Sequence, residues 1–192
     1  NDAGSRSRSS NLPIFWAKSA TKTYGVPIQS MQATIYASDS TPDEYASACT
    51  FPLGWGKTFK IRGVRLTIDQ PAATKTVLVT LYSGTTALQT VTVDSDAQSS
   101  TTGTYRPTTV YFDEATLTTL TFGTLYRIGF APQETAADFG VWSLTVATAA
   151  ELTAYPMAGN CYLSTRTDAG AWTDDTATAP MVEWILEDIT KP

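Results

Sequence analysis

Short segments in which apolar and polar side chains alternate recur along this chain, and that period of two limits its fold more than any other feature. Within 76–83, Val77, Val79 and Leu81 share one parity, as expected of a strand with one buried and one exposed face. The segment 125–131 repeats the pattern. About ten such segments, separated by turn residues, are typical of an antiparallel β-sandwich or jelly roll. We therefore predict an all-β chain.

The expected strands occupy most of the sequence. They lie at 31–37, 45–51, 59–69, 76–83, 87–94, 108–113, 117–122, 125–131, 139–147, 161–167 and 181–188. Within 59–69 the parity of the apolar residues changes at Arg62-Gly63, which predicts a β-bulge. A hairpin is expected around the short loop 84–86.

Composition agrees with this fold class. Threonine supplies 34 of the 192 residues, and its branched side chain suits a pleated strand better than a helix. One short helix is predicted at 147–155, where Pro156 would end it, and the polar stretch 167–180 is predicted to be a loop.

The first 30 residues differ from the rest of the chain. Residues 1–30 combine a polar start with apolar anchors interrupted by prolines, which predicts an extended arm lying along a surface, followed by a single β-sandwich domain at 31–192. Its candidate assembly contacts are Arg6, Arg8, Phe15 and Trp16.

Charge and hydropathy exclude two classes of partner. A net charge of -5 argues against a nucleic-acid partner, which requires a basic face. No apolar run approaches the roughly 20 residues that span a bilayer, so no membrane partner is expected. No signal peptide is visible, and because the sequence starts at Asn1, a leader removed from a precursor stays open.

The two cysteines, Cys49 and Cys161, leave two alternatives open. They either form a disulfide or remain two buried thiols in strands, where free cysteine behaves as a small hydrophobe.

The sequence predicts no catalytic, metal or cofactor site. It contains no histidine, so it cannot build a Ser-His-Asp triad, a Cys-His dyad or a zinc site of the usual kind. Paired carboxylates are the remaining enzymatic route. The acids considered for it are Glu114, Glu134, Glu151, Glu183, Glu187 and the aspartates. Most of these aspartates lie in predicted turns, and Glu183 and Glu187 alternate with core residues, so we expect them to be solvated.

Loop aromatics carry the strongest indication of binding. Trp55, Tyr105 and Trp172 lie in Gly- and Thr-rich loops, where an exposed ring offers a flat apolar platform to a sugar or a protein. The alternative is that each ring folds back onto the end of the sandwich. Asp168 and Asp174 lie beside Trp172 as further candidate contacts. Together with Asp175 they are also a candidate calcium loop, but an acidic turn explains them more simply.

Several consecutive segments of the sequence together resemble a known kind of module. The segments VRLTI, VLVTLYSG, LQTVTVD, TVYFD and LTFGTLYRIGFAP, all within 64–132, resemble the jelly-roll, carbohydrate-binding-module-like sandwiches of phage virion proteins and of some secreted glycan-active proteins. WSLTVA and CYLSTRTDAGAWTD are similar to the same kind of module. The resemblance is one of strand rhythm and contains no catalytic signature, so it implies a fold more than a function.

These observations lead to an expectation about function. We expect a non-catalytic virion structural or capsid decoration protein of a phage-like particle, which binds other virion proteins and forms a homo-oligomer, with a trimer as the expected state. The alternative is a secreted carbohydrate-binding or adhesion module that uses the loop aromatics.

Overall fold

The computed structural model describes residues 33–35, 42–51, 57–69, 76–94, 106–133, 139–141, 143–145, 161–176, 178–180 and 182–190. This part of the chain is almost entirely β-structure. The strands are β1 (Ala33–Ile35), β2 (Glu44–Thr50), β3 (Phe59–Asp69), β4 (Thr76–Ser83), β5 (Thr86–Asp94), β6 (Arg106–Tyr111), β7 (Thr118–Thr119), β8 (Leu125–Pro132), β9 (Phe139–Val141), β10 (Ser143–Thr145), β11 (Cys161–Arg166), β12 (Thr173–Asp175), β13 (Thr178–Pro180) and β14 (Val182–Asp188). The described helical structure is the 3-10 turn η2 (Glu114–Thr116), and no described helix has the length and apolarity to cross a bilayer.

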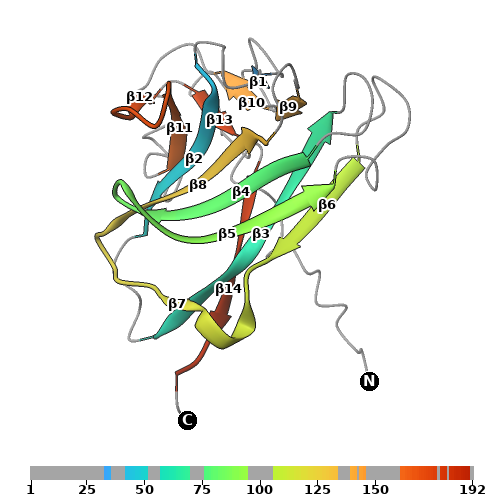
Figure 1. The fold of residues 1–192 in the computed structure, drawn as a ribbon. Coiled ribbons are helices and arrows are strands. Elements are labelled where there is room, and N and C mark those ends of the chain that lie inside the picture. Colours follow the sequence, from blue (N-terminus) through green and yellow to red (C-terminus); the bar gives the residue numbers. More distant parts are fainter. Residues whose placement is uncertain are drawn as a thin grey trace, which may run out of the picture.

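The strands form two six-stranded antiparallel sheets (Figure 1). The first, here the β3 sheet, has the order β1-β9-β3-β14, with β6 and β7 also paired to β3. The second, here the β8 sheet, has the order β12-β11-β2-β8-β4-β5. β10 and β13 form a separate two-stranded sheet. This arrangement is consistent with the predicted β-sandwich.

A single hydrophobic core receives side chains from both large sheets. From β4 it receives Val77, Val79 and Leu81, which are fully buried as their parity predicted. Trp184 of the β3 sheet donates a hydrogen bond from Nε1 to Oγ of Ser47 in the β8 sheet, at 3.2 Å, and so links the two layers directly. Burying these faces supplies the main driving force for folding.

The predicted β-bulge in β3 is confirmed. Ile185 of β14 pairs with Gly63 and Leu186 pairs with Ile61, so that Arg62 is the extra residue of the bulged strand. A Cβ at position 63 would lie 2.2 Å from the carbonyl oxygen of Val110 in β6, which explains why a glycine occupies this position.

The hairpin between β4 and β5 is also confirmed, with a shorter loop than expected. Its turn consists of Gly84 and Thr85, because Thr86 already pairs with Ser83. Gly84 has φ 59, a conformation that glycine adopts without a Cβ penalty.

Five expectations about secondary structure need correction or fall outside the described residues. The predicted loop 167–180 contains β12 and β13, which have no apolar alternation and form by pairing with neighbouring strands. The predicted strand 117–122 shortens to β7, and 139–147 divides into β9 and β10. The turn η2 was not predicted. The predicted helix at 147–155 and the arm at 1–30 lie outside the described residues.

Candidate functional site

A cluster of polar and aromatic side chains lies on the outer face of the β8 sheet, opposite the core. Except for Trp172, its residues occupy strand positions whose neighbours point inward. Tyr126 and Ile128, for example, enter the core, while Arg127 between them faces outward. We call it the outer-face cluster, and its members are Glu44, Tyr82, Arg127, Tyr162, Ser164, Arg166, Trp172 and Asp174.

Three of these residues form a closed triangle of hydrogen bonds. The hydroxyl of Tyr82 donates to Oε1 of Glu44 at 2.9 Å, and Nε of Arg166 donates to Oε2 of Glu44 at 2.6 Å. Nη2 of Arg166 also donates to the hydroxyl oxygen of Tyr82 at 2.7 Å. Glu44 is only 7% exposed, so both of its oxygens are engaged in a nearly dry environment. A buried carboxylate in such a place requires a partner, and Arg166 supplies it.

Gly129 makes room for this triangle. It pairs with Ala46 of β2 and Thr80 of β4, and the Glu44 side chain passes over it to reach Tyr82. A Cβ at position 129 would lie 2.2 Å from Oε1 of Glu44. The glycine therefore has a steric role at this point of β8.

A second hydrogen-bonded group is centred on Arg127. Its Nε donates to Oγ of Ser164 at 3.0 Å, its Nη2 to Oδ1 of Asp174 at 3.0 Å, and its Nη1 to the carbonyl oxygen of Gly84 at 2.9 Å. Ser164 also hydrogen-bonds to Asp174, and the hydroxyl of Tyr162 donates to Oδ2 of Asp174 at 3.1 Å. Arg127 is 5% exposed, and all three of its terminal donor groups are used.

Trp172 joins the two groups. Its ring centroid lies 4.5 Å from Cζ of Arg166 and 5.3 Å from Cζ of Arg127, and it makes an edge-on contact with the ring of Tyr82 at 5.6 Å. Cations over an indole face are attracted by its quadrupole, so the ring is held in place from two strands. Nε1 of Trp172 is buried and has no hydrogen-bond partner among the described residues.

A tight turn brings Trp172 to this position. Asp168 and Ala169 have φ 51 and φ 55, and the amide of Gly170 donates to the carbonyl oxygen of Thr167 at 2.8 Å. Two successive positive φ values are those of a type I′ turn, the usual connection of a hairpin. The amide of Asp168 also donates to Oδ2 of Asp43 at 3.1 Å, which ties the turn to the start of β2.

The environment shifts the pKa values of four members of the cluster. Burial raises the pKa of Glu44 above its usual range, and the Arg166 guanidinium offsets this only in part. Burial and the adjacent Glu44 raise the pKa of Tyr82 to about 12. Burial and Asp174 likewise raise the pKa of Tyr162. Partial burial would raise the pKa of Asp174, but hydrogen bonds from Ser164, Arg127 and Tyr162 outweigh burial and lower it.

The outer-face cluster is suited either to stabilising the local structure or to binding a ligand. Glu44 and Asp174 balance Arg166 and Arg127, and each charge already has an ion-pair partner. The half-buried Trp172 and the more exposed Asp174 are the members that an external group would meet first. Among the residues that the structure describes, no group of acidic or cysteine side chains has the arrangement to hold a metal ion.

The structure places some of the sequence-predicted contacts in this cluster. Trp172 and Asp174 both belong to it, whereas Asp168 lies in the adjacent turn and contributes its backbone amide. Trp172 lies in the loop between β11 and β12, as expected, and immediately precedes β12. The remaining candidates lie outside the described residues: Arg6, Arg8, Phe15, Trp16, Trp55 and Tyr105.

The sequence reasoning missed Glu44, Tyr82, Arg127 and Arg166. A signal existed for Arg127, which is the lone charge in the otherwise uncharged strand Leu125–Pro132 and therefore needs a partner if both faces are covered. For Glu44 the signal was weaker: the small Ala46 and Ala48 share its parity and leave space on that face.

Three of the acids that are candidates for catalysis instead pair with arginines of β3, and Glu114 is one of them, 3.5 Å from Arg62. Glu187 lies 3.1 Å from Arg62, and Glu183 lies 4.0 Å from Arg65. Their side chains are 40% and 31% exposed, so the expectation that both acids are solvated holds only in part. Ion pairs with this exposure contribute little to stability.

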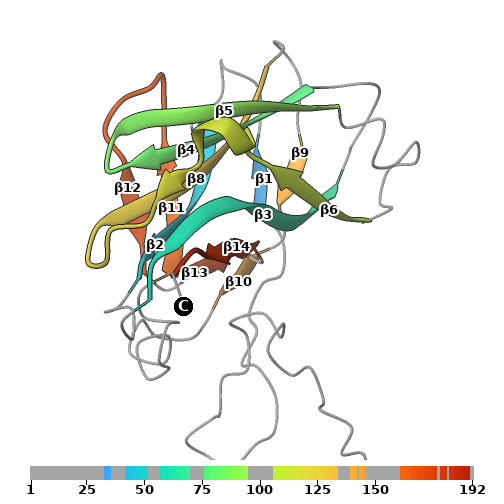
Figure 2. The same ribbon diagram turned by 90° about the horizontal axis from the view of Figure 1, so that it is seen from below.

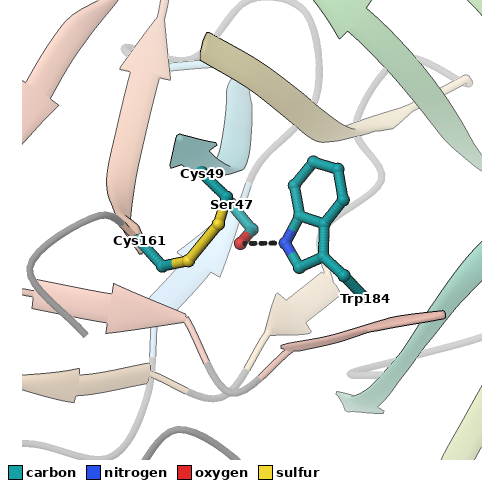
Figure 3. Close-up of a disulfide and its surroundings, with 4 residues drawn as sticks. All are labelled: Ser47, Cys49, Cys161 and Trp184. Atoms are coloured by element: carbon teal, nitrogen blue, oxygen red, sulfur yellow. Dashed lines mark hydrogen bonds between the residues drawn. A yellow bond between two sulfur atoms is a disulfide. The ribbon is translucent and has the colours of Figure 1, made fainter. Parts of the chain in front are cut away.

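The two cysteines form a disulfide, which decides between the two alternatives left open by the sequence. Cys49 of β2 lies directly opposite Cys161 of β11, and both are almost fully buried on the core side. Figure 3 shows the bond beside the hydrogen bond between Ser47 and Trp184. The disulfide therefore joins two of the strands whose opposite faces carry the outer-face cluster.

Comparisons with protein-family models, with curated proteins and with solved structures find no match to this chain.

Proposed function

We propose that the chain is a non-catalytic structural or decoration protein of a phage-like virion, which acts through protein–protein assembly. The non-catalytic part of this proposal is supported by the outer-face cluster, in which the charged side chains are bonded to one another. Its most buried acid, Glu44, has both oxygens occupied by Arg166 and Tyr82, and Arg127 has its donors occupied as well. A general acid or base needs a proton-transfer atom within reach of the substrate, so the bonded state of these side chains supports a non-catalytic role.

The assembly part rests on the sequence. The strand rhythm of 64–132 resembles that of phage virion sandwiches, an acidic net charge of -5 suits a protein present at high local concentration, and the apolar anchors of 1–30 would find partners on a neighbouring subunit. Ordering such an arm costs roughly 1–2 kcal/mol per residue, so it should become ordered where it gains contacts. The proposal includes a jelly-roll order of strand connections and a homo-oligomer, with a trimer as the expected state.

The mass of the protein in solution tests this proposal. The intact chain and a chain lacking residues 1–30 are compared by sedimentation, with and without candidate shell proteins. We expect the intact chain to associate with itself or with a shell protein and the shortened chain to do so more weakly. A strict monomer in both forms, with no binding to any shell protein, would refute the proposal.

A second candidate function, a glycan-binding module, is favoured by one specific observation. Trp172 presents a half-buried indole beside the partly exposed carboxylate of Asp174. An aromatic face with hydrogen-bonding groups at its rim is suited to a sugar ring.

A glycan array followed by tryptophan fluorescence titration tests the second candidate. A saturable response should be lost in Trp172→Ala and kept in Tyr111→Ala, which removes an aromatic that is 58% exposed on the other sheet. A response that is absent, or equal in both variants, eliminates the glycan hypothesis.

A further inference from the structure

β5 is an edge strand of the β8 sheet. It pairs with β4 and with no other strand that the structure describes. Figure 2 shows it at the margin of the molecule, with β4 beside it. An edge strand presents a row of N–H and C=O groups that can pair with another chain.

β5 has two of the features that usually protect an edge, the charged Asp94 at its last position and a bulge near the turn, and its remaining residues provide no others. Proteins commonly protect an edge with charged side chains or proline, but residues 86–93 contain no Lys, Arg, Asp, Glu, Pro or Gly. Several of its side chains are exposed to solvent: Thr86, Ala87, Leu88, Thr90 and Thr92. Leu88, the extra residue of the bulge in β5, is 40% exposed.

Three other edge strands among the described residues are poorer candidates for pairing with a copy of themselves. β14 carries Glu183, Glu187 and Asp188, so an antiparallel pair of β14 strands would place acids near acids. β12 has three residues, two of which are aspartates. β6 contains Pro107, which has no N–H to donate.

Two features leave the rest of β5 regular and already ordered. Its bulge is at the turn end, where Tyr82 pairs with Ala87 and Leu81 pairs with Gln89, so the pairing from Gln89 to Asp94 continues without a shift. The Gln89 side chain accepts a hydrogen bond from the amide of Asp113 at 3.2 Å and donates to the carbonyl oxygen of Thr116. A partner therefore meets a strand that loses little further freedom on binding.

We propose that β5 pairs edge to edge with β5 of a second copy of this chain, antiparallel and about a two-fold axis, so that the β8 sheet continues from one subunit into the other. The contact is isologous and needs only backbone groups and side chains of which Asp94 alone is charged. The inference rests on the proposed assembly function and names a self-association surface for it. Since this contact closes at two subunits, a trimer would require a different one.

The test measures the dissociation constant of the full chain by sedimentation over a wide range of concentration. Thr92→Lys places a charge at an exposed position of β5, and pairing about a two-fold axis brings two such charges close together. We expect the dissociation constant to rise by about two- to fivefold. Thr173→Lys, which adds the same charge at an exposed position of β12, is the matched control and should leave the constant unchanged.

Hydrogen exchange provides a second readout that needs no variant. In the wild type, amides of 86–94 should become more protected as concentration rises, while those of 182–188 should not change. A wild type that stays monomeric, a dimer equally stable in Thr92→Lys and wild type, or unchanged exchange in 86–94 would overturn the inference. Association that persists in Thr92→Lys would still support an assembly function, through another surface. Binding to shell protein is measured independently, so the β5 contact and the proposed assembly function can fail separately.

Discussion

Gly129→Ala should expose how strongly the outer-face cluster depends on one missing side chain. The new methyl group would lie 2.2 Å from Oε1 and 3.2 Å from Cδ of Glu44, and 2.9 Å from Cε2 of Tyr82. Oε1 belongs to a side chain, but it cannot swing away freely, because Arg166 and Tyr82 hold the Glu44 carboxylate in a buried position. The substitution must therefore disturb either this triangle or the backbone of β8.

Opposing effects determine how much Gly129→Ala changes the free energy of unfolding. Alanine in place of glycine within a strand gains about 0.5–1 kcal/mol, because the unfolded chain loses freedom. Overpacking a tight site costs about 1–3 kcal/mol, and each hydrogen bond to a buried charged group contributes about 1.5–3 kcal/mol. If one of the two bonds to Glu44 is weakened, the net result is a loss of about 2 kcal/mol in the free energy of unfolding.

Urea unfolding at neutral pH, followed by circular dichroism, measures this loss. A double-mutant cycle with Glu44→Ala is the control, since removing the carboxylate removes the closest contact and leaves the contact with Tyr82. In that background Gly129→Ala should cost less than about 1 kcal/mol, which gives a coupling of at least about 1 kcal/mol. A neutral or stabilising Gly129→Ala in the wild-type background, or an additive cycle, would refute the reasoning.

Three further predictions concern other parts of the structure. Cys161→Ala should lower the free energy of unfolding by about 4–5 kcal/mol, because the lost disulfide closes a loop with a sequence separation of 112; reductant should destabilise the wild type but not this variant. Tyr82 has a pKa of about 12 in the folded chain and 10.0 in the unfolded chain, so it should stabilise the fold below pH 10 and lose this contribution as the pH rises towards 12. Unfolding curves taken at each pH should therefore show that the free energy of unfolding falls less for Tyr82→Phe than for the wild type over this range. Gly63→Ala should destabilise by about 2–3 kcal/mol in thermal unfolding, because its methyl group would meet the backbone carbonyl of Val110 at 2.2 Å; an unchanged melting temperature would contradict this.

Local patterns in the sequence were sufficient to place most strands. β3 and β4 begin and end where the alternation of their apolar residues begins and ends, and the change of parity at Arg62-Gly63 located the bulge. A strand with one buried face must alternate, so this information lies within each segment. β12 and β13 have no such pattern, and they are strands because β11 and β10 offer them backbone partners.

The candidate site was only half visible in the sequence. Trp172 and Asp174 are recognisable in the sequence as candidate contacts, because an aromatic and an acid in a polar stretch are unusual for a core. Glu44, Tyr82 and Arg166 looked like ordinary strand residues, and they come together only because β2 lies between β8 and β11 while β4 lies on the far side of β8. The spacing of these residues along the chain does not indicate this order of strands in the sheet.

What the sequence determined by itself was therefore the class of structure: an all-β chain, the faces of its strands that turn inward, and the absence of histidine-based chemistry within these residues. Tertiary structure alone decided that Cys49 faces Cys161, that Glu44 meets Arg166 across 122 residues, and that Gly129 must lack a side chain. The physical reason is that alternation is a property of neighbours in the chain, whereas pairing depends on which strands share an edge, and that choice is made by the packing of the whole sheet.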